Sequence, residues 1–248
     1  MTGSEDSSRL SRISTRWEEL LVAQQGEGAA ASAAQKSILC RYCGAIYRYL
    51  LRMVRDPNTA EELSQEFALR FVRQDFKALR PERGRFRDFV KRALANQVTD
   101  YYRRQRLSTD VQPYALTGLA APDSMDDSDA EFVRQWRGEL LARVWEALAS
   151  EEAATGKLYH TILHWRVQHP REPALRLAED LQAKLGRPFT DGGIRVTLHR
   201  ARERFADLLL DEVARSLQTA DIGRMEQELI DLDLLTYCRS ALERRTQT

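Results

Sequence analysis

The chain has 248 residues, of which 43% are hydrophobic, and this is enough to bury a core in each of one or two folded domains. Its uncharged stretches, such as the Ala-rich residues 28–35 and the longer 111–122, are far shorter than the roughly 20 apolar residues that cross a bilayer, so we expect no membrane association. The N-terminus lacks the apolar segment of a signal peptide, and three cysteines provide no disulfide framework, so we expect a cytoplasmic protein.

Charge is nearly balanced over the whole chain, with 38 basic and 37 acidic residues, but it is unevenly distributed. Residues 77–106 contain ten Lys or Arg and three acidic residues, whereas residues 107–133 contain six acidic residues and no Lys or Arg. A basic segment followed by an acidic one is typical of a chain in which one part contacts phosphates. The charge pattern therefore favours nucleic-acid binding, although the net charge of +1 does not.

Apolar residues recur at spacings of three and four, and the alternating runs typical of strands are absent. We therefore predict an all-α fold, with helices at Thr15–Gln25, Ala30–Arg55, Thr59–Gln74, Phe86–Arg106, Asp129–Ser150, Lys157–Val167, Pro173–Leu185, Asp191–Leu217 and, in two pieces, Asp221–Arg244. Residues 107–128 contain Pro113, Gly118 and Pro122 without a periodic apolar face, which favours an acidic, flexible linker. The predicted organisation is a disordered tail (1–14), an N-terminal domain (15–106), the linker (107–128), a C-terminal domain (129–217) and a helical extension (218–248).

In the first predicted domain, a basic turn beginning at Pro81 leads into a helix that ends with two tyrosines and three arginines. Aromatic rings stack on unpaired bases while neighbouring guanidinium groups hold the backbone, so this pattern is typical of single-strand binding. The alternative is that Phe86, Phe89 and Tyr101 belong to the core and that the arginines form an ordinary solvated face.

In the second predicted domain, the residue pattern favours a helix-turn-helix. An apolar stripe (Leu175, Leu177, Ala178, Leu181, Leu185) ends at Gly186, a candidate C-cap, and Thr190 stands where the next helix needs an N-cap. In that next helix Ile194, Leu198, Ala201, Phe205 and Leu208 share one face, and the opposite face is basic with small residues, as in a helix that enters the major groove. The alternative is an ordinary amphipathic surface helix with solvated arginines.

Three stretches, residues 60–67, 81–106 and 190–210, together resemble the extracytoplasmic-function (ECF) sigma factors of bacterial RNA polymerase. In that family they are the polymerase-binding helix, the promoter-melting and minus-ten helix, and the minus-thirty-five recognition helix. The resemblance covers residues 30–217 and implies a sigma factor, not an enzyme, that directs RNA polymerase core to promoters and assists DNA melting. The implied partners are the clamp and flap of the polymerase core and both double-stranded and melted promoter DNA, without a cofactor.

The resemblance also assigns roles to individual residues. The implied minus-ten and melting residues are Arg83, Arg85, Arg87, Lys91, Tyr101, Tyr102, Arg103, Arg104 and Arg106. The implied minus-thirty-five residues are Thr190, Gly192, Arg195, Val196, His199 and Arg200. The implied polymerase-binding residues are Glu62, Leu63, Gln65, Glu66, Phe67 and Arg70.

The polymerase-binding helix departs from the family pattern, which usually has Asp at the position of Glu62 and a Val-Phe pair at Phe67-Ala68. Some relatives are thought to be activated by phosphorylation in this helix, so a Ser/Thr kinase acting on Ser64 is one expected regulator and an anti-sigma factor is another. The alternative is that Ser64 is an ordinary exposed serine.

The extension carries an apolar stripe of its own, formed by Ile222, Met225, Leu229, Leu232, Leu235, Cys238 and Leu242. We expect it to fold back on one of the two domains. The alternative is a partner-binding or autoinhibitory segment whose acidic residues dock on the basic helix at residues 86–106.

Two residue pairs have the spacing of functional sites but lack the rest of such a site. Cys40 and Cys43 form half of a zinc motif without a second cysteine pair, and His160 and His164 lack the glutamate of a metalloprotease motif, so we expect no metal and no catalytic residue. The alternative functions are a sigma-like adaptor or a helix-turn-helix regulator without promoter-initiating activity. A dimeric repressor is less favoured, because it needs no single-strand grip.

Overall fold

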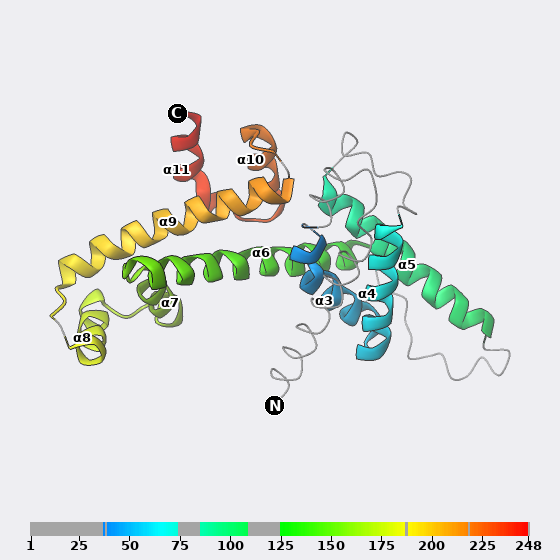
Figure 1. Ribbon diagram of the computed structural model, residues 1–248, viewed down its shortest axis with the longest axis horizontal. Coiled ribbons are helices and arrows are strands. Elements are labelled where there is room, and N and C mark those ends of the chain that lie inside the picture. The colour runs from blue at the N-terminus through cyan, green and yellow to red at the C-terminus, as the bar shows by residue number, and fades with distance from the viewer. Residues whose placement is uncertain are drawn as a thin grey trace. The chain divides into compact units, whose positions relative to one another are not determined.

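Every regular element among the described residues is a helix, which confirms the predicted all-α fold (Figure 1). The computed structural model describes Ser37 and residues 39–73, 85–108, 125–186, 188–217 and 219–247. The predicted tail, the helix at 15–25 and linker residues 109–124 lie outside the described residues. The chain divides into two compact units, Met1–Glu139 and Leu140–Thr248. Within the described residues, no helix combines the length and the hydrophobicity needed to span a bilayer.

The first unit contains helices α3 (Cys43–Val54), α4 (Pro57–Val72), α5 (Phe86–Ser108) and the first part of α6 (Met125–Thr155). Helix α3 ends because Arg55 adopts a left-handed conformation at φ 56°. Helix α4 begins two residues before the predicted start, because Asp56 accepts a 2.8 Å hydrogen bond from the Thr59 amide and Pro57 suits the first helical position.

Aromatic packing draws the beginning of α6 into the first unit. The rings of Tyr42 and Trp136 stack at 3.9 Å and are nearly parallel, and Phe132 meets Tyr49 edge-on at 5.3 Å. At Gly44 a Cβ atom would lie 2.6 Å from Glu139 Oε2, so the glycine allows Glu139 its close approach. The two compact units meet at 139/140, within α6. Within the predicted linker, residues 107–108 and 125–128 are helical.

The second unit contains the remainder of α6 and helices α7 (Tyr159–Gln168), α8 (Ala174–Leu185), α9 (Asp191–Leu217), α10 (Ile222–Asp231) and α11 (Leu235–Thr246). Helix α9 packs against α7, α8, α10 and α11, so it is the central element of this unit. Its bounds agree with the prediction. Helix α8 ends at the predicted C-cap, Gly186, whose φ of 65° is easily adopted by glycine.

The predicted apolar stripe of α8 is only partly buried. Leu177, Ala178 and Leu181 are in the core, whereas Leu175 and Leu185 are exposed. Leu175 points away from the face that the three buried residues define, whereas Leu185 continues that face one turn beyond Leu181 and is exposed because it is the last residue of the helix.

The C-terminal extension packs on α9, in agreement with the expectation that it folds back on one of the domains. Met225, Leu229 and Leu232 of α10 and the following turn are buried, as are Cys238 and Leu242 of α11. Burial raises the pKa of the Cys238 thiol to about 12, so this cysteine stays protonated and unreactive at neutral pH. The apolar face of the extension is thus used within the second unit.

We expect the extension to be needed for the stability of the second unit. Replacing the fully buried Leu229 with Ala should cost about 2–5 kcal/mol of unfolding free energy, because it leaves a cavity between helices. Tyr237→Ala, at a side chain that is 73% exposed, is the matched control and should change stability by about 0.5 kcal/mol or less. Urea unfolding followed by circular dichroism measures both, and equal stabilities for the two variants would contradict this packing.

Candidate nucleic-acid interface

Helix α5 is held on the first unit by two hydrogen bonds to backbone carbonyls of neighbouring helices. Buried Gln97 donates from Nε2 to the carbonyl oxygen of Leu63 in α4 at 3.0 Å, and the hydroxyl of Tyr102 donates to the carbonyl oxygen of Met53 in α3 at 2.8 Å. Burial, followed by the nearby Tyr101, raises the pKa of Tyr102, and Arg55 opposes the shift. The Tyr102 hydroxyl therefore stays protonated and anchors the helix.

The C-terminal part of α5 presents a basic, partly aromatic surface, which we call the α5 basic end (Tyr101, Arg103 and Arg104). The side chains of Arg103 and Arg104 are 72% and 62% exposed. Their carboxylate partners are Asp100 at 3.1 Å and Glu66 of α4 at 3.9 Å, and exposed pairs of this kind are readily exchanged for other anions. The Tyr101 hydroxyl accepts a 2.7 Å hydrogen bond from Gln105. The predicted cations Arg83 and the side chain of Arg106 lie outside the described residues.

The N-terminal part of α5 differs from the prediction. Arg87 is only 5% exposed, because it lies on the same helical face as the buried Val90 and Leu94, so its prediction as a surface cation was wrong. Arg85 pairs with Asp88 at 3.1 Å, and Lys91 Nζ pairs with Asp129 of α6 at 2.7 Å. These cations are engaged within the first unit.

Helix α4 divides the predicted polymerase-binding residues between its two faces. Glu62 is exposed, and Gln65, Glu66 and Arg70 are partly exposed, with Glu66 and Arg70 paired at 3.9 Å. Leu63, Ser64 and Phe67 are buried together with Ala60, Ala68 and Phe71, whose spacing places them all on the inward face.

The burial of the inward face corrects three predictions on α4. Leu63 and Phe67 are core residues and offer no surface to a partner. Ser64 is fully buried, so it is neither the exposed serine nor the accessible phosphorylation site that the sequence suggested. A phosphate of nearly two negative charges would not be accommodated in this apolar surrounding.

The N-terminal part of α9 presents the second candidate surface. Gly192, Arg195, Val196, His199 and Arg200 are all exposed, and we call them the α9 reading face. On the opposite side Ile194, Leu198, Ala201 and Leu208 are buried, as predicted, and Phe205 is partly buried. Two of the exposed side chains have acidic neighbours one turn away: Arg195 pairs with Asp191 at 2.8 Å, and His199 Nε2 lies 3.7 Å from Glu203.

The predicted N-cap of α9 explains one of its two glycines. The Thr190 hydroxyl accepts a 3.1 Å hydrogen bond from the amide of Gly193. A Cβ atom at position 193 would lie only 3.0 Å from that hydroxyl oxygen, so glycine gives the cap its room. At Gly192 a Cβ atom would meet nothing, and the structure offers no packing reason for this second glycine.

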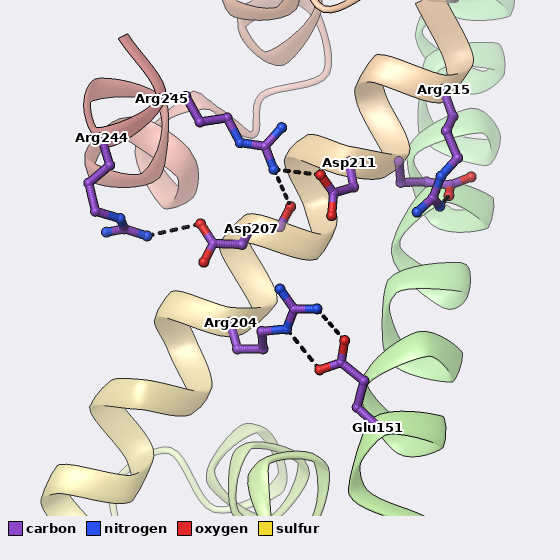
Figure 2. Close-up of polar contacts among 8 residues, drawn as sticks. Glu151, Arg204, Asp207, Asp211, Arg215, Arg244 and Arg245 are labelled. Atoms are coloured by element: carbon purple, nitrogen blue, oxygen red, sulfur yellow. Dashed lines mark hydrogen bonds and ion pairs between the residues drawn. The ribbon is translucent and has the colours of Figure 1, made fainter. Parts of the chain in front are cut away.

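A two-point ion pair joins α9 to α6 within the second unit (Figure 2). Arg204 Nε donates to Glu151 Oε2 at 2.8 Å, and its Nη2 donates to Glu151 Oε1. The hydrogen bond from Arg204 lowers the pKa of Glu151 below its ordinary value, against a smaller opposing effect of burial. The sequence held no signal for this pair, because its members are 53 residues apart.

The cysteine and histidine pairs take structural positions. Cys43 is buried and Cys40 is partly buried, and His160 and His164 stack on each other and meet the Trp145 ring edge-on at 5.7 and 5.8 Å. Among the described residues, no group of three or more histidine, cysteine or acidic side chains is arranged to hold a metal ion.

Residues 40–108 match the family model described as Sigma-70 region 2. Comparisons with curated proteins and with solved structures gave no match. The matched segment contains α3, α4 and α5, and it therefore includes the α5 basic end. The match supports a sigma-70 family factor with a role in promoter recognition and polymerase binding. Proteins of that family are transcription initiation factors and not enzymes, in agreement with the sequence prediction.

The Glu151–Arg204 pair should make stability depend on pH. Because the folded protein lowers the pKa of Glu151, the pair stabilises the native state at neutral pH and loses its effect as the pH falls through that lowered pKa. Glu151→Gln should therefore cost about 1 kcal/mol or less at neutral pH, since the pair is partly exposed, and nothing in strong acid.

Thermal unfolding of both proteins across the acid range measures this difference. Glu226→Gln, on the exposed side of α10, controls for the loss of one negative charge. A stability gap that stays constant with pH would show that Glu151 does not act through its charge.

Proposed function

We propose that this protein is an ECF-type sigma factor that directs RNA polymerase core to specific promoters in the cytoplasm and assists DNA melting. The observation that carries the proposal is the match of residues 40–108 to Sigma-70 region 2, combined with an exposed basic helix face in the second unit. One surface in each unit suits a protein that contacts a promoter at two separate elements.

In this proposal the α5 basic end holds the melted strand. Arg103 and Arg104 supply the phosphate contacts, and the partly exposed Tyr101 ring offers a surface on which an unpaired base can stack. The anchors at Gln97 and Tyr102 hold α5 in place, so the arginines are presented from a rigid helix. The exposed edge of α4, with Glu62, Gln65, Glu66 and Arg70, is the proposed polymerase contact.

The α9 reading face is the proposed minus-thirty-five reader, with α8 as the first helix of a helix-turn-helix. Arginine recognises guanine through two hydrogen bonds in the major groove, and Arg195 is 72% exposed at the N-terminal end of α9, where such contacts are made. Gly192 and Val196 beside it keep the surface low, which permits close approach of the helix to the bases.

A sigma-like adaptor without initiating activity is the second candidate. It is favoured by one observation, that Arg85, Arg87 and Lys91 are paired or buried and so leave fewer cations on α5 for a melted strand. Run-off transcription with RNA polymerase core on a randomised promoter library separates the two functions. Sequence-specific transcripts support a sigma factor, and polymerase binding without transcripts supports the adaptor.

Reversing the charge of both exposed arginines in the α5 basic end should impair melting. For Arg103→Glu/Arg104→Glu we expect the slope of log affinity against log salt to fall by about 2, one for each lost phosphate contact, and open complexes to decrease. Permanganate reactivity of unpaired thymines measures opening, and circular dichroism should show unchanged helicity. Arg103→Lys/Arg104→Lys keeps the charge and should retain most activity. Normal opening by the Glu variant would exclude this surface as the strand-binding site.

Reading and anchoring should separate along α9. Arg195→Ala should change preference at one base position by about 1–3 kcal/mol, because it loses a base contact. Arg204→Ala should weaken binding to all sequences alike and lower thermal stability, because it frees α9 from Glu151 of α6. Selection of bound DNA from a random library by each holoenzyme compares the two. The same sequence preference for Arg195→Ala and the wild type would remove Arg195 from the reading face.

A further inference from the structure

Helix α9 carries one continuous stripe of ionisable side chains spaced four residues apart. It consists of Asp191, Arg195, His199, Glu203, Asp207 and Asp211. Side chains four residues apart are neighbours one turn apart, and a row at this spacing turns gradually around the helix, by about 40° per step. The stripe starts at the α9 reading face, and its last three members, Glu203, Asp207 and Asp211, are all acidic. The helix that is proposed to approach DNA therefore also carries a row of negative charge, which we call the acidic row.

The C-terminal extension places two arginines on this acidic row (Figure 2). Arg244 of α11 lies 3.6 Å from a carboxylate oxygen of Glu203 and 3.0 Å from one of Asp207. Arg245 pairs with Asp211 at 2.5 Å and also donates to the carbonyl oxygen of Asp207 at 3.1 Å. The buried stripe of the extension fixes α11 on α9, so both guanidinium groups are held at these carboxylates.

The three carboxylates are at different distances from the reading face. With a rise of about 1.5 Å per residue, Glu203 is about 6 Å along the axis from His199, Asp207 about 12 Å and Asp211 about 18 Å. Since charges are screened over about 8–10 Å at physiological salt, an uncompensated Glu203 would repel DNA phosphates near the reading face, whereas Asp211 would contribute little. Of the two arginines, Arg244 is therefore the one whose charge affects DNA near the reading face, and Arg245 mainly holds α11 on α9.

Glu203 has two neighbours, His199 on its own helix and Arg244 of α11. One of its oxygens lies 3.7 Å from His199 Nε2 and the other 3.6 Å from Arg244. While Arg244 compensates the carboxylate, Glu203 has less attraction for His199, which is 74% exposed and oriented to solvent. Without Arg244, Glu203 would hold His199 more strongly and withdraw it from a base edge.

We propose that Arg244 is a positioning residue for promoter reading: it neutralises Glu203 and leaves His199 available to DNA. The extension thereby has a role in recognition besides its role in the core. This inference rests on the proposed function of α9 as a DNA-reading helix and identifies what tunes that helix.

The test uses the full chain with RNA polymerase core and double-stranded DNA selected by the wild-type holoenzyme from a random library. Arg244→Gln should lower affinity for this DNA about two- to fivefold, the range of a partly exposed ion pair. It should also alter preference at the same base position that His199→Ala alters. The double variant Glu203→Gln/Arg244→Gln should recover wild-type affinity and preference, because Asp207, the other carboxylate that Arg244 contacts, lies about 12 Å from His199, beyond the screening distance.

Arg239→Gln is the matched control. Arg239 is exposed on the same helix and, among the residues that the structure describes, pairs with none of the three carboxylates, so its loss removes an equal charge and should leave binding unchanged. Arg244→Lys should retain most of the effect of the native residue.

Three outcomes would overturn the inference. Arg244→Gln that binds like the wild type excludes any role in reading. Loss of affinity that Glu203→Gln does not restore, with a lowered melting temperature and unchanged base preference, shows a structural role alone. A wild-type holoenzyme that selects no DNA sequence overturns the proposed function itself, and with it this role, and so is distinguishable from the other two results.

Discussion

Helix α9 has to satisfy two opposed requirements along one length of chain, and the second unit is arranged around this constraint. One face is buried against α7, α8, α10 and α11, which supplies the apolar contacts that hold the unit together. Another face is exposed and carries polar and charged side chains at its N-terminal end. The two-point pair from Arg204 to Glu151 and the arginines of α11 lie where these faces meet (Figure 2). These ion pairs hold α9 against α6 and α11 through polar side chains. Apolar contacts at the same positions would have to cover the exposed face of the helix.

In the first unit, helix α5 is held by hydrogen bonds to backbone carbonyls and also keeps an exposed face. Gln97 and Tyr102 donate to two backbone carbonyl oxygens, one within α4 and one near the end of α3, and so hold α5. The α5 basic end follows directly after these anchors. The aromatic stack of Tyr42 and Trp136 makes the beginning of α6 part of the first unit. The first unit therefore extends beyond the Sigma-70 region 2 match, which ends at residue 108.

The distribution of paired cations bears on the choice between an initiating factor and an adaptor. In α5, the cations of the N-terminal part are used within the unit, and those of the C-terminal part keep only exposed, easily exchanged partners. A strand-binding surface on this helix is therefore restricted to its C-terminal part. On α9, Arg195 and His199 each have an acidic neighbour one turn away on the same helix, and both side chains stay exposed to solvent.

The sequence by itself determined the helices, the caps at Gly186 and Thr190 and the inner face of α9, because periodicity and capping depend on residues within a few positions of each other. It also pointed to Sigma-70 through local motifs, which the match to region 2 supports. Only the tertiary structure decided which polar side chains are available. Ser64 and Arg87 are buried because neighbouring helices cover their faces, and the acidic row of α9 is compensated by α11. Burial and ion pairing between distant segments depend on packing, which no local pattern encodes.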